Sequence, residues 1–126
     1  THEIAKNADF ISFGTNDLTQ TTFGFSRDDI GSFIGNYIKK SILPKDPFVS
    51  IDRDGVGKLV KRAVAGARST NKSIKIGICG EHGGDPESIA FFNELEITFL
   101  NPDFSLLTLA QSHRILPFLL TGVNDY

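Results

Sequence analysis

Four adjacent residues near the start of the chain are of the types that bind an anionic ligand and a cation. Gly14, Thr15, Asn16 and Asp17 offer a glycine, a hydroxyl, an amide and a carboxylate in a row. Glycine lets the backbone approach a ligand closely, and the Asn16 amide can donate to an oxyanion. The Asp17 carboxylate can hold Mg²⁺, which favours one or two carboxylates together with substrate oxygens and water. The alternative is that Thr15 or Asp17 only caps a following helix.

A second group of candidate residues surrounds the only cysteine, Cys79, in the run GICGEHGG over residues 77–84. A thiol with a pKa of about 8.5 can act as a proton donor at neutral pH. Glu81 and His82 could orient a ligand or tune this thiol, or they could be polar residues of a loop. A lone cysteine is more often a buried, inert small hydrophobic residue. His82 has no second ligand at a matching spacing, so it does not by itself predict a metal site.

Three short apolar runs predict the strands that would carry these residues. They cover residues 9–13, 73–79 and 96–100, and they are rich in β-branched and aromatic side chains. Segments with helical spacing predict helices over residues 28–39, 55–69, 86–95 and 105–116. Alternating strands and helices are typical of βα units on a parallel sheet. The chain is about half as long as a complete eight-fold βα barrel, which takes roughly 250 residues.

The two candidate groups each follow the carboxyl end of a predicted strand. Gly14 ends the first of these strands, and Cys79 ends the second. In parallel α/β folds this edge of the sheet faces the ligand crevice. We therefore expect the run from Gly14 to Asp17 and the thiol of Cys79 to line one site.

Local signals define the ends and faces of the predicted helices. Asp52 or Asp54 could cap the helix over 55–69, and Asp85 followed by Pro86 is typical of an N-cap with proline at the first helical position. The basic residues of helix 55–69 are expected on a solvated face; they are Lys58, Lys61, Arg62 and Arg68. The aromatic pairs are expected to pack rather than to stack on nucleic-acid bases; they are Phe23 with Phe25, and Phe91 with Phe92.

Composition excludes several classes of protein. The 126 residues suit one domain, and 13 Lys plus Arg against 15 Asp plus Glu give a net charge of -2, which argues against a non-specific nucleic-acid binder. No apolar run approaches the roughly 18 residues of a membrane span, and no signal peptide is recognisable. One cysteine excludes an internal disulfide and a multi-cysteine metal site. Neither a Walker A sequence nor a dinucleotide-binding fingerprint occurs.

Two long motifs resemble a known family. The run DFISFGTNDLTQTTFGFSR over residues 9–27 resembles the signature of the phosphoenolpyruvate (PEP)-utilising enzymes, which include pyruvate, phosphate dikinase, PEP synthase and enzyme I of the sugar phosphotransferase system. The run GICGEHGGDP over residues 77–86 is similar to the dikinase branch, as are RDDIGSF, DPFVSID and GVGKLV between the two motifs. The likeness extends from about Ala5 to Phe92, and residues 93–126 diverge from the family pattern.

The resemblance implies a fold and a reaction. Residues 1–126 would be the carboxyl-terminal part of a PEP/pyruvate-binding domain, a partial (β/α)8 TIM barrel with about its last three βα units. The whole enzyme would transfer a phosphoryl group between a phosphohistidine on another domain and pyruvate to give PEP, while ATP and phosphate become AMP and pyrophosphate. His82 would not be that phosphohistidine. This chain alone would be inactive, because the second Mg²⁺-binding carboxylate and the phosphate-binding arginines of the family lie on earlier strands.

The same resemblance implies roles for the two candidate groups. Gly14, Thr15, Asn16 and Asp17 would bind substrate, and Asp17 would be a ligand of Mg²⁺. Cys79 would be the general acid/base that protonates the methylene carbon of the enolate.

The expected partners are PEP or pyruvate, the phosphohistidine domain and, in the parent enzyme, a second copy in a homodimer; nucleic acid and membrane are not expected. The compartment would be the cytoplasm, a plastid or another organelle.

Two alternative functions stay open. One is a PEP synthase-like enzyme, which the run from Glu81 to Gly84 disfavours. The other is a catalytically inactive, truncated binding or oligomerisation module, because a half-barrel exposes strand edges that need a partner.

Overall fold

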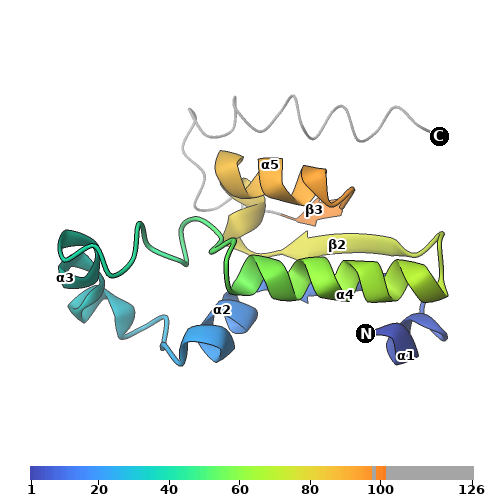
Figure 1. Ribbon diagram of the computed structural model, residues 1–126, viewed down its shortest axis with the longest axis horizontal. Helices are drawn as coiled ribbons and strands as arrows, with labels where there is room; N and C mark the ends of the chain where they lie inside the picture. The colour runs from blue at the N-terminus through green and yellow to red at the C-terminus, as the bar shows by residue number, and fades with distance from the viewer. Residues whose placement is uncertain (98, 102–126) are drawn as a thin grey trace.

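The computed structural model describes residues 1–97 and 99–101, and it has a small parallel sheet flanked by helices (Figure 1). The three strands lie in the order β1-β2-β3, and both neighbouring pairs are parallel. This confirms the predicted α/β class. In chain order the elements are α1 (His2–Ala5), β1 (Phe10–Gly14), α2 (Thr15–Phe23), the 3-10 helix η1 (Ile30–Ser32), α3 (Ile34–Lys39), α4 (Val56–Thr70), β2 (Lys75–Cys79), the 3-10 helix η2 (Glu81–Gly84), α5 (Pro86–Glu94) and β3 (Phe99–Asn101).

All three predicted strands are present, but the third begins later than its apolar pattern indicates. Residues 96 and 97 follow the C-cap of α5 and their amides bond back to the helix: Glu96 N donates to Asn93 O, and Ile97 N donates to Phe92 O. Glu96 has a positive φ of 54°, which lies outside the strand region. The prediction of a strand from residue 96 was therefore wrong by three residues, since β3 begins at Phe99.

The amphipathic helix predicted over 55–69 is α4, shifted by one residue. The N-cap residue of α4 is Gly55, so the prediction of Asp52 or Asp54 at that position was wrong, although Asp52 Oδ2 accepts from the amides of Gly55 at 2.7 Å and Val56 at 3.3 Å. The cap predicted for α5 is confirmed, because Asp85 Oδ2 accepts from Ser88 N at 2.8 Å. These carboxylates satisfy amides that have no partner within the first turn of a helix.

The prediction of one continuous helix over 28–39 was wrong. The segment is divided into η1 and α3, because Phe33 between them has a φ of -132°, which a helix does not allow. The helix predicted over 105–116 lies outside the described residues.

One face of the sheet is covered by α4 and α5. Ile74, Ile76 and Ile78 share a single core cluster with the apolar face of α4 and with Phe92 of α5. The two helices also approach each other closely, since a Cβ atom on Gly57 of α4 would lie 3.0 Å from the Phe91 ring. Alternation along a strand therefore sends the even-numbered residues of β2 into this core.

The opposite face of the sheet has no such helical cover within the described residues. Phe10, Ser12 and Gly14 of β1 pair in register with Lys75, Gly77 and Cys79 of β2. Of these six residues all but Gly77 are exposed, and Phe10, a large apolar residue, is 49% exposed. No described helix is long and apolar enough to cross a membrane.

A long connection between α2 and α4, which we call the α2–α4 arm (residues 24–55), extends away from the sheet, with α3 at its far end (Figure 1). Phe25 of the arm stacks on Phe23, the last residue of α2, and meets Phe33 and Tyr37 of the arm edge-on. Phe91 and Phe92 likewise pack in the core. Both pairs therefore act as the packing residues that the sequence predicted.

Arg68 departs from the prediction for the basic residues of α4. Lys58, Lys61 and Arg62 are exposed as expected, whereas Arg68 is half-buried. Its guanidinium donates to Leu95 O at 2.7 Å and to Glu96 O at 2.6 Å. Arg68 therefore holds the end of α4 to the carboxyl end of α5, where carbonyl groups lack partners within the helix.

Candidate active site

The two candidate groups meet at the carboxyl edge of the sheet, as the sequence predicts. Gly14, the last residue of β1, is the register partner of Cys79, the last residue of β2. Adjacent strands are about 4.8 Å apart, so the Cys79 backbone lies next to the start of the run that continues to Asp17. Cys79 is exposed. The alternative of a buried cysteine is therefore wrong, and the reactivity of the thiol stays a prediction.

Thr15 is buried and does not face solvent. The residue is 0% exposed, and its Oγ1 atom lies 2.8 Å from Nδ1 of His82. The Thr15 hydroxyl therefore bonds to His82 in the loop after β2 and does not cap α2. Asp17 makes no such cap either: its Oδ1 accepts weakly from the Gln20 side-chain amide at 3.5 Å, within α2.

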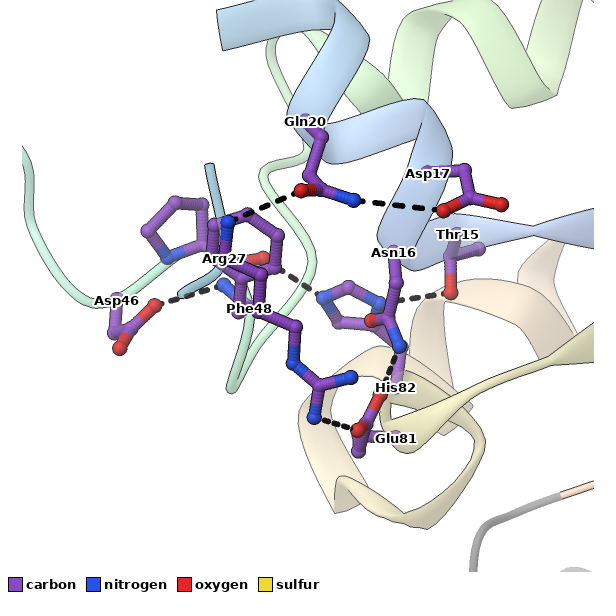
Figure 2. Close-up of polar contacts among 10 residues, drawn as sticks. Thr15, Asn16, Asp17, Gln20, Arg27, Asp46, Phe48, Glu81 and His82 are labelled. Atoms are coloured by element: carbon purple, nitrogen blue, oxygen red, sulfur yellow. Dashed lines mark hydrogen bonds and ion pairs between the residues drawn. The ribbon is translucent and has the colours of Figure 1, made fainter. Parts of the chain in front are cut away.

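His82 joins two segments that are distant in sequence, and Figure 2 shows its ring between Thr15 and the α2–α4 arm. The residue is 0% exposed, and its Nε2 atom lies 2.8 Å from Pro47 O. A carbonyl oxygen only accepts hydrogen bonds, so Nε2 carries the ring proton. His82 is therefore a buried, doubly bonded residue, while the roles of orienting a ligand and tuning the Cys79 thiol stay predictions.

The protonation state of His82 follows from its surroundings. Burial lowers the pKa of the ring, while the hydrogen bond to Pro47 and the nearby carboxylates of Asp85, Glu81 and Asp46 act in the opposite direction; the pKa remains below its ordinary value. The ring is therefore neutral at pH 7. Neutral Nδ1 is an acceptor when Nε2 is protonated, so the Thr15 hydroxyl donates to it.

Glu81 connects Asn16 to an arginine of the α2–α4 arm (Figure 2). One carboxylate oxygen accepts from Asn16 Nδ2, and the other accepts from the Arg27 guanidinium. Partial burial alone would raise the pKa of the Glu81 carboxyl, but the hydrogen bond from Asn16 and the charge of Arg27 hold it below its ordinary value. Glu81 is therefore an anion that orients the Asn16 amide.

Arg27 is a site residue that sequence reasoning missed. It lies 54 residues from Glu81 in the chain, and neither residue type nor spacing indicates their pairing. Its backbone also approaches the site, because Arg27 N donates to Gln20 Oε1 at 3.0 Å, and the Gln20 amide contacts Asp17. The contacts of Asn16, Glu81, Arg27, Gln20 and Asp17 thus form one connected series around the start of α2 (Figure 2).

Two side chains at this edge carry oxygen atoms of the kind that bind a hard cation. The Asp17 carboxylate is exposed, and no lysine or arginine of the described residues forms an ion pair with it. Asn16 Oδ1 is buried and, among the described residues, accepts no hydrogen bond. Carboxylate and amide oxygens are both ligand types that Mg²⁺ prefers, and its remaining ligands are often water and substrate; the two side chains are neighbours in sequence but point in different directions (Figure 2). The described residues hold no cluster of three or more His, Cys, Asp or Glu side chains suited to a metal.

Gly80 allows the loop after β2 to approach these residues. Its φ of 123° and ψ of -179° lie in a region that essentially only glycine occupies. A Cβ atom here would lie 3.3 Å from Asn16 Nδ2 and 3.4 Å from Thr15 Oγ1. The backbone between Cys79 and Glu81 therefore packs directly on the first two residues of α2.

Comparison with known proteins identifies one family. The family described as "PEP-utilising enzyme, PEP-binding domain" matches residues 1–111. The chloroplastic pyruvate, phosphate dikinase of Flaveria trinervia is 56% identical over 99 residues, which cover 79% of this chain and 10% of that protein. Pyruvate, phosphate dikinase of Rickettsia typhi is 50% identical over 99 residues, covering 79% of this chain and 11% of that protein. The chain thus spans about a tenth of the length of these relatives.

Proposed function

The chain belongs to the PEP-utilising enzymes, whose PEP-binding domain it matches, and from this premise we propose that it forms part of a site that interconverts pyruvate and PEP. Relatives named pyruvate, phosphate dikinase point to a phosphotransferase. A phosphohistidine on another domain would exchange its phosphoryl group with pyruvate, and the whole enzyme would convert ATP and phosphate to AMP and pyrophosphate. Residues 1–126 would act as one part of that enzyme, which would form a homodimer.

The sheet would belong to a (β/α)8 barrel and supply about its last three βα units. Both covering helices, α4 and α5, share one core with the same side of the sheet, whereas the side bearing Phe10 and Ser12 is exposed. Parallel sheets are almost always covered on both faces. In a barrel the exposed side would turn inward toward the remaining strands, and the run from Gly14 to Asp17 would lie at the carboxyl-terminal face, where barrel enzymes carry their active sites.

The register pair of Gly14 and Cys79 is the observation that carries this proposal. It supports a substrate bound by the run from Gly14 to Asp17, with its methylene carbon toward the exposed thiol. Toward pyruvate, the Cys79 Sγ–H bond breaks, the enolate π electrons form the new C–H bond at C3, and a thiolate remains. In the reverse direction the thiolate takes a methyl proton.

The other site residues would bind and orient the substrate. The Asp17 carboxylate, with Asn16 Oδ1 beside it in sequence, would hold Mg²⁺, which when bound neutralises negative charge on the substrate oxygens. The second amide hydrogen of Asn16 stays free to donate to an oxyanion, because Glu81 takes only one. Thr15 is buried and would contribute indirectly, because its bond to His82 would hold the following residues, Asn16 and Asp17, in place.

The test is a chimera in which this chain replaces the matching segment of the Flaveria trinervia enzyme. We expect it to exchange the methyl protons of pyruvate with deuterium, followed by ¹H NMR, and Cys79→Ala to slow that exchange by about 10²–10⁴-fold, the usual contribution of a general acid/base. Lys61→Ala on the exposed side of α4 is the control. An unchanged rate in Cys79→Ala would support the alternative of a non-catalytic module. A requirement for inorganic phosphate would separate a dikinase from a PEP synthase-like enzyme.

A further inference from the structure

Consecutive residues of η2 hold consecutive residues of α2. Glu81 accepts from Asn16, and His82 bonds to Thr15. The Glu81 contact is partly exposed, whereas both partners of the His82 contact are 0% exposed. The contact between His82 and Thr15 is therefore shielded from water. In the protein interior a hydrogen bond is stronger than in water, and its loss costs more free energy.

His82 has no freedom in how it forms its two hydrogen bonds. Pro47 O fixes the proton on Nε2, and the neutral Nδ1 then accepts from the Thr15 hydroxyl. The result is a directed series from the Thr15 hydroxyl through the imidazole ring to the Pro47 carbonyl. It links the start of α2, the loop after β2 and the α2–α4 arm.

Both partners of the bond at Nδ1, His82 and Thr15, lie near residues of the proposed site in the chain. Cys79, the last residue of β2, is three residues before His82, and Asn16 and Asp17 directly follow Thr15. The short segment between Cys79 and His82 is constrained as well, because Gly80 packs against Thr15 Oγ1 and Asn16 Nδ2. The placement of the thiol relative to the Asp17 carboxylate therefore depends on the bond between His82 and Thr15.

We propose that His82 is a positioning residue that, through its Nδ1 bond to the Thr15 hydroxyl, fixes Cys79 relative to Asn16 and Asp17. The importance of this positioning for the reaction rests on the proposed function, whereas the hydrogen bond between His82 and Thr15 and its effect on the position of Cys79 do not. A histidine that only filled the interior would need no particular tautomer and no particular partner. Here each ring nitrogen has a different partner, and only one tautomer satisfies both.

The first experiment determines the tautomer in the 126-residue chain by ¹⁵N NMR of the imidazole nitrogens. We expect a protonated Nε2 and an unprotonated Nδ1 at pH 7. A protonated Nδ1 would overturn the proposal, because the Thr15 hydroxyl would then not donate to the ring. This measurement needs neither a substitution nor PEP.

The second experiment compares two substitutions that each keep one end of the series. In His82→Asn the amide takes the place of Nδ1 and can still accept from Thr15, whereas in His82→Gln it reaches the place of Nε2 and keeps the bond to Pro47. We expect His82→Gln to shift the backbone amide resonances of Asn16, Asp17 and Cys79, and His82→Asn to restore them. Thr15→Val removes the same bond from the other side and should reproduce the shifts of His82→Gln. If His82→Gln leaves these resonances unchanged, the proposal is wrong.

A third measurement connects the geometry to binding. By isothermal titration with PEP in the presence of Mg²⁺, we expect His82→Gln to weaken binding about tenfold, the size of one buried hydrogen bond, and His82→Asn to weaken it less. Equal losses in both variants, in proportion to a common loss of stability, would indicate a merely structural role. If the unsubstituted chain does not bind PEP while the tautomer and the resonance shifts are as expected, the proposed function fails and the positioning role stands.

Discussion

Replacement of Gly80 by alanine should disturb the candidate site through backbone conformation alone. With a φ of 123° and a ψ of -179°, a residue with a side chain is strained by about 1–3 kcal/mol. The new Cβ would also lie 3.3 Å from Asn16 Nδ2 and 3.4 Å from Thr15 Oγ1, so these atoms must move by a few tenths of an ångström. We therefore expect Gly80→Ala to lower the free energy of unfolding by about 1–3 kcal/mol.

Urea unfolding of the chain, followed by circular dichroism, measures this loss. With a denaturant slope of about 1–3 kcal/mol/M, a loss of about 2 kcal/mol lowers the midpoint by roughly 1 M. Gly66→Ala in α4 is the matched control, because a Cβ there meets no heavy atom within 4 Å, and removing glycine from a helix interior stabilises by about 0.5–1 kcal/mol. If Gly80→Ala is as stable as the unsubstituted chain, the loop does not have the described conformation and the argument for close packing on Thr15 fails.

Three further predictions concern the cation, the end of α5 and the buried histidine. Asp17→Asn should reduce the affinity for PEP in Mg²⁺ to the value measured without Mg²⁺ in isothermal titration, whereas Asp54→Asn, at an exposed carboxylate, should leave it unchanged; equal effects would exclude Asp17 as a ligand. Arg68→Ala should lower the free energy of unfolding in urea by about 1–3 kcal/mol, because it frees two carbonyls, while Lys61→Ala should change it by less than about 0.5 kcal/mol. Burial lowers the pKa of His82 in the folded chain below its ordinary value of 6.5. Between the folded-state pKa and pH 6.5 the unfolded chain therefore binds more protons than the folded chain. The contribution of His82 to stability is complete above pH 6.5 and is lost as the pH falls through the folded-state pKa. Urea midpoints between pH 7.5 and 5 should show this decline, and His82→Asn should flatten it; an equal slope in the variant would contradict the assignment.

The fold could be predicted from the sequence wherever the signal was local. The apolar spacing of α4 and the Asp85-Pro86 start of α5 depend on residues within one or two turns, and both predictions are confirmed. The errors arose where backbone conformation overrides side-chain pattern. Phe33 continues an apolar helical face but has a non-helical φ, and Glu96 has a positive φ that delays β3. A pattern of side chains carries no direct signal for such a break.

The candidate site was predicted only in outline. Placing Gly14 and Cys79 at one edge required the general rule for parallel sheets, and the register pair confirms it. The contacts that hold the site together were not predictable, because His82 and Thr15 are 67 residues apart and Glu81 and Arg27 are 54 apart. Their pairing depends on how the α2–α4 arm returns to the sheet, which no local pattern encodes.

The α2–α4 arm has a consequence for variation in chain length. Both of its ends are tied to the loop after β2 and the start of α5, by Arg27 on one side and by Pro47 and Ser50 on the other. Between these ties the exposed turn at Ser41 lies beyond α3, far from the sheet. Each doubling of a flexible loop costs only about 0.6 kcal/mol of closure entropy. We therefore expect insertions and deletions among homologues to concentrate at this turn, where a change in length leaves the spacing of the site intact.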